Sequence, residues 1–220
     1  MISSDIAGIA LVYIYVAILL LITEKILDNH STIGRKILHI MVGNIAFLLS
    51  IFQTREAMAF VAAAPFILIT FLMSQYSPIK SIKSRTSTAG HGMGLLYCSI
   101  SWTILSYLFF DHKEIIAIGI LAMSYGDGFA SLVGMKLGNR TYNIFGDEKS
   151  YLGSITMFIF AFVMSLIALN FYGISIYDKL PILAYIALVA TVAEALSPKG
   201  LDNLSVPFIV PAIYWIFVFT

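Results

Sequence analysis

Long apolar runs separated by short charged loops constrain this chain more than any other feature of its sequence. A helix needs about 20 apolar residues to cross a bilayer. We expect eight such spans, at residues 4–23, 37–53, 56–74, 92–110, 114–136, 152–172, 180–196 and 205–219. Only 11% of the residues are charged and 60% are hydrophobic, whereas a soluble domain carries about 25% charged residues. The sequence therefore predicts an all-α, polytopic membrane helix bundle of eight transmembrane helices, or seven if one run is re-entrant.

The composition also limits the domain organisation and the partners. No segment resembles an independent soluble domain, so residues 1–220 are expected to form a single integral-membrane domain. The net charge of +1 gives no electrostatic footprint for nucleic acid. Cys98 is the only cysteine, which excludes an internal disulfide and a thiolate zinc cluster. The first apolar run follows Asp5 rather than a basic segment, so we interpret it as a retained span and not as a signal peptide.

The basic residues of the loops predict an orientation. Ten of the 13 Lys and Arg residues fall in the loops after the first, third, fifth and seventh spans: Lys25, Arg35, Lys36, Lys80, Lys83, Arg85, Lys136, Arg140, Lys149 and Lys199. The opposite loops hold Arg55, Lys113 and Lys179. Since cytoplasmic loops are enriched in Lys and Arg, we expect the first set of loops in the cytoplasm and both termini outside. The loop 77–94 contains His91 and is interpreted as an ordinary flexible connection.

A carboxylate lies inside the fifth predicted span. Residues 125–134 read YGDGFASLVG and place Asp127 at membrane depth, where a charge is costly and commonly marks a functional site. The alternative is a buried Asp bonded to a neighbouring helix. On a continuous helix, Ser131 and Gly134 share the face of Asp127.

The small residues around Asp127 allow two structures. If the helix is continuous, Gly126, Ala130 and Gly134 form a strip against which another backbone packs closely. Alternatively, Gly126 and Gly128 interrupt the helix and expose backbone groups to a watery cavity within the protein.

Two clusters of cations and small polar residues suit phosphate binding. Arg35 and His39 share a helical face at the start of the second span, with Lys36 beside them. Arg binds phosphate through a bidentate fork and Lys as a point charge, although such a pair also suits contact with lipid headgroups. In the second cluster, Lys149 precedes Ser150, the expected N-cap of the sixth span. With Gly153 and Ser154 this helix start forms either a phosphate seat or a simple cap.

Oxygen ligands recur near the C-terminus. Glu194 lies at the end of the seventh span, and Asp202 and Asn203 precede the last one. Such hard oxygen donors suit Mg²⁺, which also takes water and phosphate ligands. The alternative for Asp202 and Asn203 is an N-cap of the last span, which leaves Glu194 unexplained. All these polar groups fall on the predicted cytoplasmic side, which favours metal-dependent chemistry on a phosphorylated substrate.

Four of these elements, in this order, resemble the CTP-dependent lipid kinases: dolichol kinase, phytol and farnesol kinases, and the CTP-dependent diacylglycerol kinase. They are Arg35-Lys36-Ile37-Leu38-His39, residues 126–134, residues 149–154 (KSYLGS), and Glu194 followed by Asp202-Asn203. The last three elements more distantly resemble phosphatidate cytidylyltransferases. The chain has no P-loop motif and no protein-kinase motif pair.

The resemblance implies transfer of the γ-phosphoryl group of CTP to the hydroxyl of a membrane lipid alcohol of polyprenol, phytol or geranylgeraniol type, with a divalent cation. Arg35, Lys36, Asp127 and Gly134 match positions important in that family. Our own assignment of roles is a hypothesis. The catalytic group is Asp127, Arg35, Lys36 and His39. The nucleotide-binding group is Arg35, Lys36, Gly126, Gly128, Ser131, Gly134, Lys149, Ser150, Gly153 and Ser154. The Mg²⁺ ligands are Asp127, Asp202, Asn203 and Glu194.

Alternative functions remain open at this point. A CTP-dependent diacylglycerol kinase and a CDP-lipid cytidylyltransferase use the same kinds of residue. A small cation-coupled transporter is a non-enzyme alternative, although its polar groups are expected near the membrane midplane and often in repeated halves. The acceptor lipid and the oligomeric state do not follow from the sequence.

Overall fold

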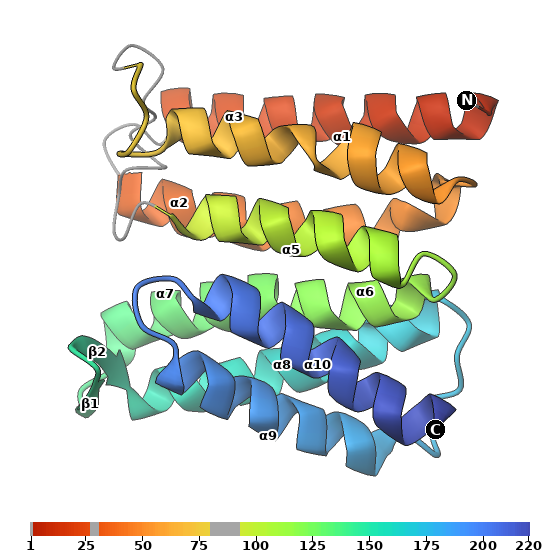
Figure 1. Cartoon of the computed structure of the whole chain (residues 1–220). Helices are drawn as coiled ribbons and strands as arrows, with labels where there is room; N and C mark the ends of the chain where they lie inside the picture. The colour runs from red at the N-terminus through yellow and green to blue at the C-terminus, as the bar shows by residue number, and fades with distance from the viewer. Residues whose placement is uncertain (1, 27–30, 80–92) are drawn as a thin grey trace.

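The computed structural model describes residues 2–26, 31–79 and 93–220, and over these residues it shows eight helical rods lying side by side (Figure 1). Four rods consist of segments joined end to end: α1 (Ser3–Leu21) with η1 (Ile22–Ile26), α2 (Ser31–Val42) with η3 (Gly43–Phe47) and η4 (Leu49–Ile51), η5 (Ala57–Ala63) with α3 (Pro65–Met73), and α6 (Lys113–Leu121) with η7 (Ala122–Asp127) and α7 (Gly128–Leu137). The other four are the single helices α5 (Gly94–Leu108), α8 (Tyr151–Phe171), α9 (Leu180–Leu196) and α10 (Asp202–Phe219). The predicted all-α bundle is confirmed.

The lengths of the rods agree with a membrane protein. Among the described residues, 5 helices are long and apolar enough to cross a membrane, and shorter apolar helices cover Ala57–Met73, Gly94–Leu108 and Leu180–Leu196. The loop residues Lys80, Lys83, Arg85 and His91, on which part of the predicted orientation depends, lie outside the described residues.

The last helix begins earlier than the sequence analysis predicted. It starts at Asp202, and its N-cap is Leu201 without a side-chain cap bond. The interpretation of Asp202 and Asn203 as an N-cap was therefore wrong. A carboxylate in the first turn is favoured by the partial positive charge of a helix N-terminus, and this explains why the helix includes Asp202.

A small β-hairpin was not expected. Strands β1 (Thr141–Ile144) and β2 (Asp147–Ser150) pair antiparallel, with Thr141 opposite Ser150. The turn between them has φ of 52° at Phe145 and 89° at Gly146, as a type I′ hairpin turn requires. The hairpin delivers Lys149 and Ser150 directly to the start of α8.

The rod that carries Asp127 runs through the bundle without interruption. Gly126 lies within the π-helical segment η7, which ends at Asp127 and continues into α7, so the continuous-helix alternative is correct. Such π-bulges are frequent at functional sites. The small-residue strip is confirmed, because a Cβ atom at Gly126 would lie 2.4 Å from Met157 Sδ of α8. A Cβ atom at Gly128 would lie 2.2 Å from Ile40 Cγ1 of α2. These two glycines let α8 and α2 approach the rod from different directions.

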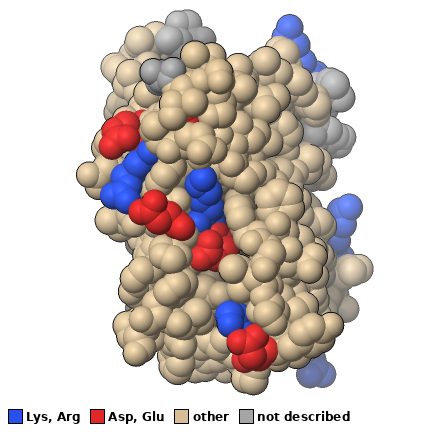
Figure 2. Space-filling view, turned by 90° about the vertical axis from the view of Figure 1, so that its right-hand side faces the viewer, with Lys and Arg blue, Asp and Glu red and all other residues tan. Residues whose placement is uncertain are grey.

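The two ends of the bundle differ in character. Both chain ends lie at the end opposite the hairpin (Figure 1). Figure 2 looks onto that end, where basic and acidic groups lie next to one another on an otherwise uncharged surface. Arg55 pairs there with Asp111 at 2.8 Å. Asp5 is fully buried and accepts bonds from the backbone N–H groups of Gln53 (2.8 Å) and Thr54 (3.2 Å) and from the Thr54 hydroxyl (2.9 Å).

Candidate active site

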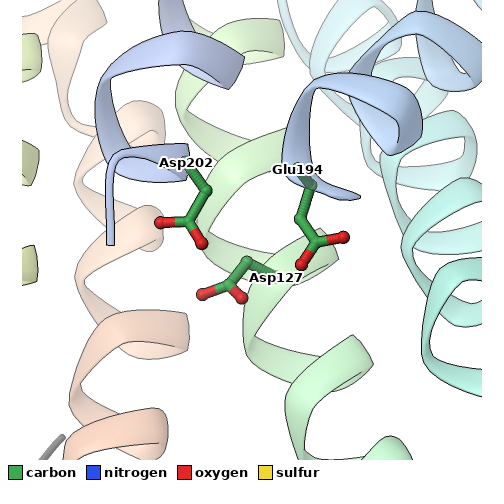
Figure 3. Close-up of side chains that lie close together, drawn as sticks. All are labelled: Asp127, Glu194 and Asp202. Carbon is green, nitrogen blue, oxygen red and sulfur yellow. The ribbon is translucent and has the colours of Figure 1, made fainter. Parts of the chain in front are cut away.

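Three buried carboxylates meet at the hairpin end of the bundle (Figure 3). Asp127 comes from the central rod, Glu194 from the last turn of α9 and Asp202 from the first turn of α10. One oxygen of each lies within 4.8 Å of the others. Their exposed fractions are 6%, 7% and 9%. Three like charges at this distance repel strongly, so the cluster requires cations around it.

The turn between α9 and α10 brings two of these carboxylates together. Lys199 (φ 53°) and Gly200 (φ 84°) are left-handed there and reverse the chain. The Ser197 and Ser205 hydroxyls lie 2.6 Å apart across the turn, and the Lys199 N–H donates to Asp147 of the hairpin at 2.7 Å. The turn, the hairpin and the carboxylates therefore form one connected unit.

The cluster lies well below the end of the central rod. Since α7 ends at Leu137, Asp127 lies roughly 15 Å inside that end at 1.5 Å per residue. The ends of α7 and α2 project beyond the ends of α9 and α10 that carry Glu194 and Asp202 (Figure 1). The carboxylates thus line the floor of a recess, and Asp127 lies inside its span as the sequence predicted.

Lys36 and His39 of α2 face Asp127. Lys36 Nζ lies 3.2 Å and His39 Nε2 3.4 Å from Asp127 Oδ2, while the Ser131 hydroxyl donates to Oδ1 at 3.2 Å. The sequence analysis placed Ser131 on this face of the helix, and the hydrogen bond confirms that placement. Lys36 and Ser131 therefore hold the two oxygens of Asp127, while His39 Nε2 lies close to Oδ2 without a hydrogen bond among the described residues.

Lys149 pairs with Glu194 on the opposite side of the cluster. Its Nζ lies 2.5 Å from Glu194 Oε1 and also donates to the Glu194 backbone carbonyl. Burial alone would lower the pKa of the Lys149 ammonium, but the charge and hydrogen bond of Glu194 outweigh burial and raise it above its ordinary value. Lys149 thus remains a cation beside the cluster.

Asp202 has a neutral neighbour. Asn203 Nδ2 donates to Asp202 Oδ1 at 2.7 Å and to the Gly200 carbonyl at 3.1 Å. Within the described residues, the buried Asn203 Oδ1 has no hydrogen-bond partner. The side chain therefore orients Asp202 and presents one free acceptor oxygen next to the carboxylates.

A polar cavity of about 510 Å³ opens above the cluster, within the usual size range of small-molecule sites. It brings together most of the residues that the sequence analysis selected: Arg35, Lys36, Asp127, Ser131, Gly134, Lys149, Ser150, Gly153, Ser154, Glu194, Asp202 and Asn203. His39 instead lines a small gap beside it. Gly126 and Gly128 are not among the described lining residues of the cavity, and the contacts of both are helix packing.

The start of α8 forms one wall of the cavity. Ser150 is its N-cap and accepts a bond from the Gly153 N–H at 2.9 Å, as predicted. A Cβ atom at Gly134 would lie 2.8 Å from the Ser150 hydroxyl, so the missing side chain lets α7 approach this helix start. Ser154 lies within hydrogen-bond distance of the Tyr142 hydroxyl, at 2.6 Å.

The sequence analysis missed the cavity residues of the hairpin and the α9–α10 turn. Thr141, Asp147 and Ser197 also line the cavity. The positive φ values at Phe145 and Gly146 mark a hairpin turn, and only the glycine was visible in the sequence as a signal for it. Because the hairpin was not predicted, the sequence analysis could not place Thr141 opposite Ser150 or bring Asp147 to the cavity.

The donor set fits a divalent cation. Three carboxylates converge from three helical elements, and the adjacent Asn203 carries an amide oxygen without a partner among the described residues; all are hard oxygen donors of the kind that Mg²⁺ prefers. Lys36 and Lys149 supply two positive charges against three carboxylates, so negative charge remains for a cation to neutralise. The cavity above supplies the space that water and phosphate ligands need.

Comparison with known proteins finds similar chains among the phytol kinases. The chain is 33% identical to a phytol kinase of Synechocystis sp. (strain ATCC 27184 / PCC 6803 / Kazusa), over 94% of this chain and 89% of that protein. It is 31% identical to a probable chloroplastic phytol kinase of Triticum aestivum, over 84% of this chain and 67% of that protein. It is 32% identical to a chloroplastic phytol kinase of Arabidopsis thaliana, over 80% of this chain and 64% of that protein. No family model and no solved structure matches the chain.

Proposed function

Because this chain belongs to the phytol kinase family, we propose that it transfers the γ-phosphoryl group of CTP to the hydroxyl of a membrane lipid alcohol of phytol, geranylgeraniol or polyprenol type, with Mg²⁺ as the metal. The relatives support a lipid alcohol kinase. The donor nucleotide, the metal and the cytoplasmic location of the site are our proposals.

One observation carries the proposal: a cluster of three buried carboxylates forms the floor of a cavity whose walls carry Arg35, Lys36 and Lys149. Phosphoryl transfer needs positioning and charge neutralisation more than covalent chemistry. Cations in the walls suit a triphosphate, and carboxylates in the floor suit the metal that accompanies it. A transporter site would not require this combination.

The cations hold the phosphates in this proposal. Arg35 offers a bidentate fork, and Lys36 and Lys149 each contact a carboxylate while lining the cavity. The start of α8 adds backbone N–H groups, which favour anions at a helix N-terminus. The bound Mg²⁺ supplies charge neutralisation and orientation of the phosphate oxygens, and Asp127, Glu194, Asp202 and Asn203 are the residues that would hold it.

Asp127 is the candidate acceptor of the alcohol proton. Its Oδ2 faces Lys36 and His39, and its Oδ1 accepts the Ser131 hydroxyl. These contacts fix the carboxylate in position, and phosphoryl transfer needs positioning and charge neutralisation more than a strong base. His39 lies on the side of the small gap and helps to orient this carboxylate.

A direct assay tests the function. Purified protein in detergent is incubated with γ-labelled CTP, Mg²⁺ and a panel of lipid alcohols that includes phytol, geranylgeraniol, a polyprenol and diacylglycerol. Label in a prenol supports the proposal, and label in diacylglycerol alone assigns the diacylglycerol kinase alternative. Release of pyrophosphate without labelled lipid would sink the proposal and identify a cytidylyltransferase. ATP and GTP replace CTP in parallel reactions to test the donor.

The variant Asp127→Asn tests the carboxylate. We expect a loss of at least about 100-fold in turnover, the lower end of what a general base commonly contributes. Asp5→Asn is the matched control, since Asp5 is a buried, hydrogen-bonded carboxylate at the other end of the bundle. Full activity of Asp127→Asn would refute the role of that carboxylate.

A further inference from the structure

A second, apolar cavity runs between α1, α2, the η5–α3 rod and α5, and the proposed function does not use it. We call it the apolar seam. Its volume is about 80 Å³, and among the residues that line it are Val12, Leu38, Ile45, Ala62, Leu95 and Trp102. Thr70 and Ser99 donate to carbonyls of their own helices at 2.6 and 3.0 Å, and among the described lining residues Ser106 Oγ and Trp102 Nε1 are the polar atoms buried without a hydrogen-bond partner. Such a surface recognises hydrocarbon.

The apolar seam is long and narrow. Along α5 it extends from Leu95 to Ser106, which is about 16 Å at 1.5 Å per residue. A small volume spread over this length describes a single-file passage. One linear chain fits such a passage, whereas two acyl chains side by side do not.

The apolar seam meets the candidate active site through a small polar gap of about 10 Å³. Leu95 lines both the seam and the gap. The gap is also lined by Lys36, His39 and Asp127, and Asp127 is the proposed acceptor of the alcohol proton. A gap of this size holds about one water-sized group, such as a hydroxyl.

Gly94 keeps this connection open. A Cβ atom at Gly94 would lie 2.8 Å from Arg35 Nη2 and 3.3 Å from Asn203 Nδ2. The gap therefore lies between α5, which lines the seam, and two polar side chains that line the nucleotide cavity. Asp127 and Lys36 line both the gap and the nucleotide cavity, so the two substrates would meet at these residues from different sides.

We propose that the apolar seam holds the isoprenoid chain of the acceptor, with its hydroxyl in the polar gap beside Asp127. This inference rests on the proposed function. The hydroxyl loses its proton on the Asp127 side of the gap, its oxygen forms the new bond to the γ-phosphorus of CTP, and the bond from that phosphorus to the β-phosphate oxygen breaks with release of CDP.

A chain-length assay tests the seam. Ala62 lines the seam on η5 and is 4% exposed. In Ala62→Phe the ring occupies the part of the seam reached by a long chain. We expect turnover of phytol and geranylgeraniol to fall at least about 10-fold, the effect of a few misfitted methylenes, while turnover of the short prenol dimethylallyl alcohol is retained. Val61→Phe is the matched control, since the neighbouring Val61 is 40% exposed on the outside of the same helix.

A photo-crosslinking experiment reads the position of the chain without turnover. A phytol analogue with a diazirine at the end of its chain is irradiated with the wild-type protein, and the adducts are located by mass spectrometry. We expect adducts on seam residues such as Met58, Ala62 and Trp102. Adducts confined to other helices would overturn the proposal that the seam holds the isoprenoid chain. An equal effect of Ala62→Phe on the turnover of short and long prenols by folded protein would also overturn it. Absence of phosphoryl transfer to every alcohol by the wild-type overturns the proposed function instead, while the crosslinks still report on the seam.

Discussion

Gly128→Ala tests how the candidate active site is assembled. Gly128 follows Asp127 directly, and the sequence analysis assigned it to nucleotide binding. In the structure its contact is with α2, because a Cβ atom at position 128 would lie 2.2 Å from Ile40 Cγ1 and 2.9 Å from Ile40 Cδ1. Ile40 is 6% exposed, so its side chain has little room to rotate away. The added methyl group must therefore push α2 from the central rod.

The size of the displacement follows from these distances. Carbon atoms pack at about 3.5–4.0 Å, so relief of the contact requires a movement of roughly 1 Å or more. The same helix carries Lys36, whose Nζ lies 3.2 Å from Asp127 Oδ2. A misplacement of about 1 Å costs on the order of 100-fold in rate, and an overpacked core loses about 1–3 kcal/mol of stability. We expect Gly128→Ala to show losses of this order in both turnover and stability.

A second substitution identifies the cause. Ile40→Ala removes the atoms that the new methyl group would meet, so Gly128→Ala/Ile40→Ala is expected to regain most of the activity lost in Gly128→Ala. Turnover is measured with γ-labelled CTP and phytol, and the free energy of unfolding is measured for all four proteins of the cycle in the same detergent. Gly173→Ala is the control, because Gly173 (φ 73°) lies in the turn after α8, where a side chain strains the backbone without meeting any neighbour within 4 Å. It should lose stability and keep the turnover of its folded fraction. If the double variant is as inactive as Gly128→Ala, the steric reasoning is refuted and Gly128 serves the nucleotide.

Three further predictions concern charge and metal. Lys149→Met leaves Glu194 buried without its 2.5 Å partner, and we expect a loss of about 1–3 kcal/mol in the free energy of unfolding. The double variant Lys149→Met/Glu194→Gln should regain this stability but not the activity. An unchanged melting temperature of Lys149→Met would contradict the stabilising role of the Lys149–Glu194 ion pair. Asp5→Asn replaces one of the two carboxylate oxygens that accept three bonds at the far end by an NH₂ donor and should lower thermal stability without changing the turnover of the folded protein. Treatment with EDTA should abolish phosphoryl transfer and lower the melting temperature in the presence of CTP, with both restored by Mg²⁺; transfer that persists in excess EDTA would exclude the metal.

The helical architecture could be predicted because the bilayer leaves few alternatives. Apolar runs of sufficient length must form helices in which every backbone group is bonded, and the eight rods follow from this constraint alone. The face shared by Asp127 and Ser131 follows from helical periodicity and is confirmed by their hydrogen bond. The N-cap of α8 at Ser150 follows from a local preference and is likewise confirmed.

The parts of the site that depend on tertiary contacts could not be predicted. The sequence does not reveal that α9 and α10 end below α7, and this difference in depth turns a cluster of charges into the floor of a recess. It also does not separate the glycines by role, since Gly126 packs on α8, Gly128 on α2 and Gly134 on the start of α8. The sequence shows that these positions are glycines, but only the folded structure shows which helix packs against each of them.

The position of α2 explains why the chemistry is located where it is. One face of this helix lines the apolar seam through Leu38 and Val42, while Lys36 faces the polar cavity. His39 lies between the two, in the gap beside Asp127. A lipid alcohol carries its reactive hydroxyl at the end of an apolar chain, and a nucleotide carries its reactive phosphate at the end of a charged one. The two can meet only where an apolar wall adjoins a polar one, and α2 provides both walls on a single helix. The close packing of Ile40 on Gly128 holds α2 beside Asp127. The packing of the two helices and the meeting of the two substrates therefore depend on the same contact.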